Sequence, residues 1–483
     1  MKKLSLLLVV FLLPCYFLFS SCDKKGDITT YEISCELENN ILKGKERVEF
    51  YNNTDNAFSL LKFNLFANAF RKDANFSPIS EQYKYKAYYS GESFGDISIN
   101  SVVDEKGSDL SFNIAGKDKN ILEVTLPKEV FPEESVVVVI DYTITLANVI
   151  ARTGVNSKTI NLANFYPILC GIDNGAFYEC VYYANGDPYF SDVSNYLVNF
   201  TYDEKYVVAS SGNVIKSESK NGKTTTCYKL DSARDFAFIL SSDFEYLTKE
   251  INGVVINYYF YNDTTPEKSL NYAVESMDYF TKTFGNYPYK TYSVVQTEFI
   301  QGGMEFPALV MISDDLEEMA YGEVIVHETA HQWWQTTVGN NEVEYSFLDE
   351  GLAEYSVVLF YENHPSYGVK RETLITSSEK TFKTFCTVYD KLFNKVDTSM
   401  IRSLDEFSSE YEYVNIAYVK PCVMYDNLRK TIGDEKFFSS LKNYYKTYYL
   451  KNATPDFLVS EFEKQVKDTS GYFYSFFEGK AII

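Results

Sequence analysis

Short apolar runs with a period of two dominate the first half of the chain. Tyr31, Ile33, Cys35 and Leu37 alternate with polar residues, a spacing that places one face of a strand on a core. Further strands are predicted at residues 48–50, 135–146, 196–202, 206–209 and 224–230. The pattern therefore predicts an N-terminal all-β domain over residues 31–245.

The pattern changes after a strand-like stretch at residues 254–261. Apolar residues at helical spacing predict a helix over residues 266–284, which Gly285-Asn286 and Pro288 end. A strand at 292–297 and helices at 321–337 and 347–363 are predicted to follow. Helices mixed with strands predict a second domain over residues 246–483, so the fold class is α+β with several domains.

An export signal opens the chain. Lys2 and Lys3 precede an apolar run at residues 4–19, which is too short for an unaided membrane span. Small residues directly before Cys22 resemble a bacterial lipoprotein processing site. We therefore expect a signal peptide at residues 1–21, a lipidated Cys22 and a tether at residues 22–30, which would anchor an exported protein to the membrane at the cell surface. Ordinary secretion or an uncleaved signal anchor is the alternative.

The net charge excludes some classes of binding partner, and the cysteine spacing indicates whether disulfides are expected. The formal charge of -22 argues against nucleic acid or an anionic membrane surface as a partner. Once Cys15 is removed and Cys22 is lipidated, the cysteines left show no spacing typical of a disulfide framework. Cys170 and Cys180 are close enough to bridge within one loop, but buried free thiols are expected for most of the cysteines.

The candidate chemistry lies in the segment HETAHQWW and in DEGLAEY downstream. His327 and His331 are four residues apart and share one face of a helix, and Glu328 lies beside them within reach of a metal-bound water. Glu350 follows after a gap of eighteen residues and adds a carboxylate. Two imidazoles and one carboxylate leave a fourth position for water, which is typical of a catalytic zinc site. The third histidine, His364, is expected at a helix end without a metal role.

These segments, together with GGMEFP upstream, resemble the aminopeptidase N-like family of zinc metallopeptidases, a gluzincin family. The segments NFYP at 164–167 and GDP at 186–188 resemble the N-terminal domain of its bacterial members, and the segment that starts at Tyr418 resembles the one that carries the catalytic tyrosine. The resemblance covers about residues 30–450. It implies a saddle-like β domain, a thermolysin-like catalytic domain with C-terminal helices, and an active site between them.

The resemblance also implies roles for single residues. His327, His331 and Glu350 would hold one Zn²⁺ per chain, Glu328 would move a proton from water to the leaving amine, and Tyr418 would donate to the oxyanion. Glu354, one turn after Glu350, either orients a ligand imidazole or is a solvated helix carboxylate.

The segment GGMEFP implies how the substrate is bound. Glu305 would bind the free α-amine of a peptide, which limits cleavage to the first peptide bond. Gly302, Gly303 and Met304 would form the substrate-binding strand, in which the glycines leave backbone exposed for pairing with the peptide.

The chain departs from the family pattern in three places, so activities other than an aminopeptidase are kept as alternatives. Residues 157–164 lack the second amine-binding Gln or Glu, and Pro421 replaces a Gly, although Tyr418 can still precede a helix that starts with proline. The chain ends at Ile483 without the family's large helical C-terminal domain, so an open cleft is expected.

We expect an aminopeptidase for short peptides. A zinc endopeptidase with an open cleft and an inactive peptide-binding surface lipoprotein are the alternatives. Side-chain preference and oligomeric state stay open.

Overall fold

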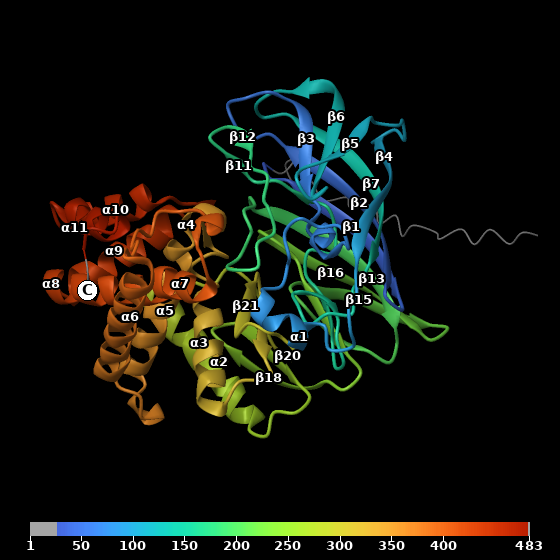
Figure 1. The fold of residues 1–483 in the computed structure, drawn as a ribbon. Coiled ribbons are helices and arrows are strands. Elements are labelled where there is room, and N and C mark those ends of the chain that lie inside the picture. Colours follow the sequence, from blue (N-terminus) through green and yellow to red (C-terminus); the bar gives the residue numbers. More distant parts are fainter. Residues whose placement is uncertain (1–26, 482–483) are drawn as a thin grey trace, which may run out of the picture.

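The computed structural model describes residues 27–481 of the chain (Figure 1). The expected signal peptide and the lipidated Cys22 lie outside this range. Along the described residues, no helix combines the length and the apolar character needed to cross a membrane. The structure is a mixed α+β fold in which strands dominate the N-terminal part and helices the C-terminal part.

A seven-stranded sheet forms the largest element of the N-terminal part. Its order is β15-β16-β13-β1-β2-β7-β4, and only the β1–β13 pair is parallel. Buried and exposed residues alternate along β1, as the period of two predicts, so one face of the sheet packs on the core. The strands are β1 (Thr30–Glu38), β2 (Ile41–Tyr51), β4 (Asp96–Asp104), β7 (Ser135–Thr145), β13 (Ser194–Asp203), β15 (Asn213–Lys220) and β16 (Lys223–Ala233).

Two four-stranded sheets complete most of this part. The first has the order β10-β3-β6-β5 and the second β14-β17-β9-β8. The second sheet joins the C-terminal part directly, because the Thr159 hydroxyl lies 2.6 Å from that of Thr297 and Ser293 donates to the carbonyl of Ser210 at 3.1 Å. The strands are β3 (Phe58–Asn64), β5 (Phe112–Ala115), β6 (Ile121–Val130), β8 (Thr153–Val155), β9 (Ile160–Leu162), β10 (Ile168–Leu169), β14 (Val207–Ser210) and β17 (Phe238–Ser241).

The C-terminal part is built on a five-stranded sheet covered by helices. The strand order is β18-β19-β20-β22-β21, so β21 lies at an edge, antiparallel to β22. Figure 1 shows β21 between the helical region and the N-terminal strands. The strands are β18 (Glu245–Ile251), β19 (Val254–Phe260), β20 (Thr291–Thr297), β21 (Gly303–Phe306) and β22 (Leu309–Ser313).

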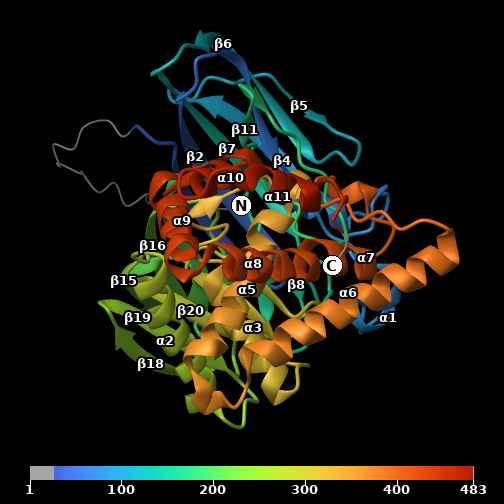
Figure 2. The same cartoon turned by 90° about the vertical axis from the view of Figure 1, so that its left-hand side faces the viewer.

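The helices stack beside this sheet and end in a helical C-terminal region. The long helix α6 extends away from the others (Figure 2). The helices of eight or more residues are α2 (Pro266–Thr283), α3 (Glu318–Ala330), α5 (Phe347–Asn363), α6 (Arg371–Phe393), α8 (Lys420–Ile432), α9 (Asp434–Thr447), α10 (Pro455–Glu463) and α11 (Thr469–Phe477).

The helix predicted at residues 321–337 is wrong at its C-terminal end, because α3 stops at Ala330. Gln335 has a φ of 110°, which reverses the chain, and the amide of Thr336 donates to the carbonyl of His331. The reversal lets Val338 pair with Lys451. The sequence here contains neither Gly nor Pro, so the local pattern carries no stop signal.

The segment around Tyr418 also differs from expectation. Tyr418 lies just before α8, as expected, but it is itself helical, in the π-helix η5 (Asn415–Val419) that joins α7 (Glu410–Val414) to α8. Pro421 lies in the first turn of α8 and has no N–H to donate, and a wider π turn directly before it accommodates that loss.

Four of the six cysteines among the described residues are buried, as expected. Among residues 27–481, the buried thiols of Cys35, Cys170, Cys180 and Cys422 form no disulfide. The fold is therefore held by its hydrophobic core rather than by covalent cross-links.

Candidate active site

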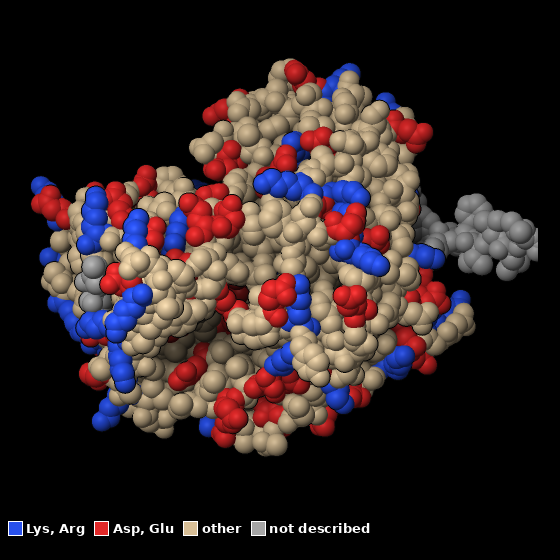
Figure 3. Space-filling model, viewed as in Figure 1, with Lys and Arg blue, Asp and Glu red and all other residues tan. Residues whose placement is uncertain are grey.

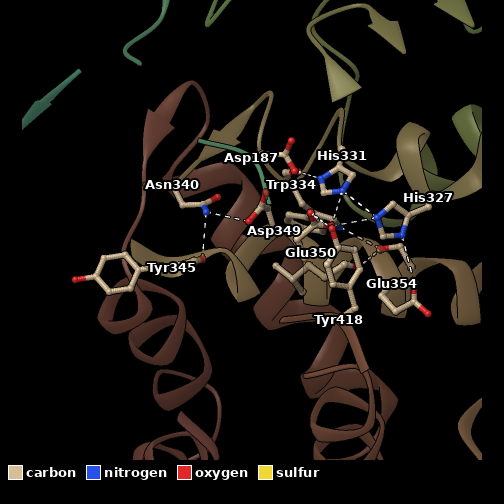
Figure 4. A network of polar contacts seen from close by, with 12 residues as sticks. Asp187, His327, His331, Trp334, Asn340, Tyr345, Asp349, Glu350, Glu354 and Tyr418 are labelled. Atoms are coloured by element: carbon tan, nitrogen blue, oxygen red, sulfur yellow. Dashed lines mark hydrogen bonds and ion pairs between the residues drawn. The ribbon is translucent and has the colours of Figure 1, made fainter. Parts of the chain in front are cut away.

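Three side chains from α3 and α5 converge on one point (Figure 4). The Nε2 atoms of His327 and His331 lie 3.0 Å apart, and each lies 3.2 Å from Oε2 of Glu350. The site is nearly closed to solvent, since His331 is 1% exposed and Glu350 3% exposed. The spacing of four residues along α3 survives the early helix end, because the amide of His331 still donates to the carbonyl of His327 at 3.2 Å.

The contacts of the two Nδ1 atoms determine the protonation state of the two Nε2 atoms, which face each other. His331 Nδ1 lies 3.0 Å from the carbonyl of Trp334, which only accepts, so this nitrogen carries a proton. His327 Nδ1 lies 3.3 Å from Oε2 of Glu354, and the same reasoning applies. If both rings are neutral, the lone pairs of the two Nε2 atoms face each other and the negative charge of Glu350, and these groups repel one another. A cation bound between the three atoms would turn this repulsion into attraction.

The donor set fits zinc. Zinc prefers imidazole nitrogen and carboxylate oxygen, and ligands about 2.0–2.1 Å from it at tetrahedral angles lie about 3.3 Å from one another. The three observed separations of 3.0–3.2 Å are close to that value. Glu354 contacts His327 from outside the triad, where it can orient the ring, one of the two roles left open from the sequence.

Glu328 lies beside the triad against Gly303. Its carboxylate is 5% exposed, its Oε2 has no hydrogen-bond partner, and burial raises its pKa to about 7. A Cβ built at Gly303 would lie 2.3 Å from Oε1 of Glu328. Glycine at this position therefore makes room for Glu328, a reason that differs from the exposed backbone expected from the sequence.

Glu305 projects from the edge strand β21 toward the same point. It is 4% exposed, its Oε1 has no partner, and it offers an oxygen within 4.8 Å of donor atoms of Glu328 and His331. Burial raises the pKa of its carboxyl well above the usual range. The strand that contains Gly303 and Met304 leaves one side without a neighbouring strand, so a peptide can pair there.

Tyr418 closes the other side of the metal triad. Its hydroxyl donates to Oε1 of Glu350, and its ring stacks on that of His327 with centroids 5.8 Å apart. The hydroxyl thus lies at the carboxylate that completes the triad. Its neighbour Tyr413, with ring centroids 5.7 Å from those of Tyr418, has a buried hydroxyl without a partner.

The structure adds acidic residues that the sequence analysis did not place in the site. Asp187, from the N-terminal part, lies near His331 in Figure 4 and forms a buried ion pair with Arg152. The Nε of Arg152 lies 2.9 Å from Sδ of Met304. The segment GDP was noted only as a family resemblance, and nothing in its local pattern points to the metal.

Two further carboxylates, Glu342 and Asp349, face Glu305 from the helical side. One oxygen from each of the three lies within 4.8 Å of the others. Residues 157–164, which lack a second amine-binding residue, contain the short strand β9 (Ile160–Leu162). Thr159, directly before this strand, and Asn161 within it hydrogen-bond to Thr297. The surface view shows a hollow between the helical part and the rest of the molecule, with acidic atoms visible inside it (Figure 3).

Comparisons with known proteins agree with this geometry. Residues 268–476 match the family model of the Peptidase family M1 domain. An aminopeptidase N from Haemonchus contortus is 21% identical over 307 residues, which cover 58% of this chain and 30% of that protein. An aminopeptidase N from Streptomyces lividans is 26% identical over 209 residues, which cover 41% of this chain and 24% of that protein. The chain thus spans less than a third of either curated relative.

Solved structures confirm the overall fold. An M1 zinc metallopeptidase from Deinococcus radiodurans matches with a TM-score of 0.69 at 16% identity, over 96% of this chain and 97% of that chain. A mutant of that enzyme bound to a Tyr-Ser-Ala substrate matches with a TM-score of 0.64 at 17% identity, over 95% of both chains.

Proposed function

We propose that this chain belongs to the aminopeptidase N-like gluzincins of peptidase family M1 and is a zinc-dependent aminopeptidase that removes the first residue from short peptides. One observation carries the proposal. Two imidazoles and a carboxylate converge on one point, and the unpartnered carboxylate of Glu305 lies next to it.

His327, His331 and Glu350 are the residues that would hold one zinc ion per chain. Zinc bound there supplies Lewis acidity to the substrate carbonyl and to the attacking water. Glu354 keeps the His327 ring oriented through Nδ1, and the carbonyl of Trp334 does the same for His331.

The residues around this point have the positions that peptide hydrolysis needs. Glu328 is the buried carboxylate without a partner on Oε2, so it accepts the proton of the attacking water and passes it to the leaving amine. The hydroxyl of Tyr418 lies at Glu350 and donates to the carbonyl oxygen as that oxygen gains negative charge.

Strand β21 and Glu305 explain why the first peptide bond is selected. A peptide that pairs with the edge of β21 runs toward Glu305, whose buried carboxylate binds a terminal ammonium group. An acetylated N-terminus has no positive charge to compensate this carboxylate and leaves it buried and unpaired, which is costly.

We also propose that the protein is exported and attached to the membrane through a lipid on Cys22. The basic residues, the short apolar run and the small residues before Cys22 support this. Its partners are then peptides outside the cytoplasm. Metabolic labelling with a palmitate analogue tests the anchor, and labelling that persists in Cys22→Ala contradicts it.

The aminopeptidase proposal is tested with one peptide in two forms, with a free and with an acetylated N-terminus. Mass spectrometry is expected to show stepwise loss of N-terminal residues from the free form only. Glu328→Ala is expected to abolish this loss while zinc content stays at one per chain. Cleavage of both forms at the same internal bond would assign an endopeptidase instead.

A further inference from the structure

Four buried polar groups near the metal triad have no hydrogen-bond partner. They are Oε1 of Glu305, Oε2 of Glu328, Oε2 of Glu342 and the hydroxyl of Tyr413. Buried polar groups are nearly always satisfied, so a concentration of orphans at one site indicates atoms that a bound molecule satisfies. The proposed reaction uses Glu328 and Glu305, but it gives no role to Glu342.

Glu342 belongs to a group of buried carboxylates for which residues 27–481 supply no ion pair. One oxygen from each of Glu305, Glu342 and Asp349 lies within 4.8 Å of the others, and all three side chains are at most 4% exposed. The amide of Asn340 donates to Asp349 at 2.9 Å, whereas Oε2 of Glu342 and Oε1 of Glu305 have no hydrogen-bond partner. The nearby Arg152 is committed to Asp187.

The group is continuous with the metal triad. Glu305 is also within 4.8 Å of donor atoms of His331 and Glu328, so it is shared between the acidic group and the catalytic side. In a peptide the N-terminal nitrogen is separated from the first carbonyl carbon by a single Cα. A carbonyl at the triad therefore places the terminal ammonium next to Glu305, on the side of Glu342.

We infer that Glu342 is a second carboxylate that binds the N-terminal ammonium of the substrate, together with Glu305. The inference rests on the proposed aminopeptidase function. An ammonium group has three donors and a full positive charge, so it satisfies both orphan oxygens and offsets the uncompensated negative charge. The second carboxylate thus comes from α4 (Glu342–Tyr345) of the catalytic part, whereas residues 157–164 of the N-terminal part supply none.

Hydrogen bonds to neighbouring segments hold the backbone at Glu342 in place. Its amide donates to the carbonyl of Tyr189 at 3.3 Å, and the side chain of Asn341 caps the amide of Val343 at 3.2 Å. Tyr189 and Asp187 lie on the same segment of the N-terminal part. The carboxylate is therefore held where the two parts of the molecule meet, and it does not need to move when the substrate binds.

The test compares wild type with Glu342→Gln, which keeps the shape and removes the charge. Kinetics use the aminoacyl p-nitroanilide that wild type cleaves fastest, and calorimetry measures binding of the matching free amino acid to the zinc-loaded protein. We expect KM and the Kd of the amino acid to rise about 10- to 100-fold in the variant, because a hydrogen bond between charged groups is lost, with kcat within about threefold. Glu342→Asp is expected to lie between the two.

Glu344→Gln is the matched control on the same helix. Glu344 accepts from the hydroxyl of Tyr178 at 2.6 Å, away from the acidic group, so KM and Kd are expected to stay at the wild-type values. Zinc content and thermal midpoint are measured for every variant. An N-acetyl amino acid serves as a ligand without the ammonium, and Glu342→Gln is expected to leave its weak binding unchanged.

The outcomes separate the two proposals. An aminopeptidase whose Glu342→Gln variant keeps wild-type KM and Kd overturns the inference alone. A second metal ion per chain that disappears in this variant also overturns it, because the acidic group would then be a metal site. Equal cleavage of free and acetylated peptides by wild type overturns the proposed function, and the inference fails with it.

Discussion

Gly303→Ala is expected to damage catalysis without removing any catalytic group. The added Cβ would lie 2.3 Å from Oε1, 2.6 Å from Cδ and 2.7 Å from Cγ of Glu328, whereas ordinary van der Waals contact begins at 3.4 Å. Glu328 is buried and packed, so relief requires its carboxylate to move by about 1 Å. A misplacement of that size costs roughly 10²-fold in rate, and we expect kcat to fall by about this factor.

The assay is steady-state cleavage of an aminoacyl p-nitroanilide, with zinc content and thermal midpoint measured on the same samples. Gly302→Ala is the comparison, because its Cβ would meet only Cγ2 of Val324 at 3.5 Å. Any loss there is expected in KM, through pairing of the substrate backbone, rather than in kcat.

A double-mutant cycle of Gly303→Ala with Glu328→Asp tests whether the loss of kcat comes from the steric clash between the two residues. Glu328→Asp shortens the side chain by one methylene and vacates the space that the Cβ needs, so its effect and that of Gly303→Ala are expected to be strongly non-additive. A Gly303→Ala variant that holds its zinc and keeps kcat within threefold of wild type refutes the steric argument.

Three further outcomes follow from the structure. Tyr418→Phe is expected to lower kcat by roughly 10²–10³ with unchanged zinc content, and an unchanged kcat removes Tyr418 from the reaction. His327→Ala is expected to lose zinc measured by mass spectrometry, whereas His364→Ala keeps it, because His364 instead packs on Phe360 with ring centroids 4.2 Å apart; zinc loss in both variants contradicts the assignment. Glu46 is fully buried with both oxygens unpartnered, and burial raises its pKa well above the usual range. The folded state therefore keeps this proton at pH values where the unfolded state has lost it. The free energy of unfolding falls as the pH rises above about 4.3, by at most about 1.4 kcal/mol per pH unit from this group, until the folded-state carboxyl also ionises. Urea titrations at pH 5, 6 and 7 are expected to show this slope in wild type and its reduction in Glu46→Gln; equal slopes refute it.

The sequence alone was sufficient for the metal triad and for much of the secondary structure. His327 and His331 share a helix face through their spacing, and α5 begins and ends at the predicted residues 347–363. The family resemblance expected from these motifs agrees with the match of residues 268–476 to the Peptidase family M1 domain. The helices and the shared face of the two histidines depend on contacts within a few residues, which a local pattern records. Glu350 lies on another helix, and its place in the triad was expected from its spacing after the histidines.

The tertiary structure decided everything that depends on distant contacts. α3 stops at Ala330 because Val338 pairs with Lys451, a partner more than a hundred residues away. Gly303 is needed because Glu328 arrives from another element, and Glu342 faces Glu305 only because α4 and β21 meet at the cleft. From the sequence, the carboxylate of Glu342 in its short segment would be expected to be solvated. Only the tertiary structure buries it beside other carboxylates, where it can bind a cationic group.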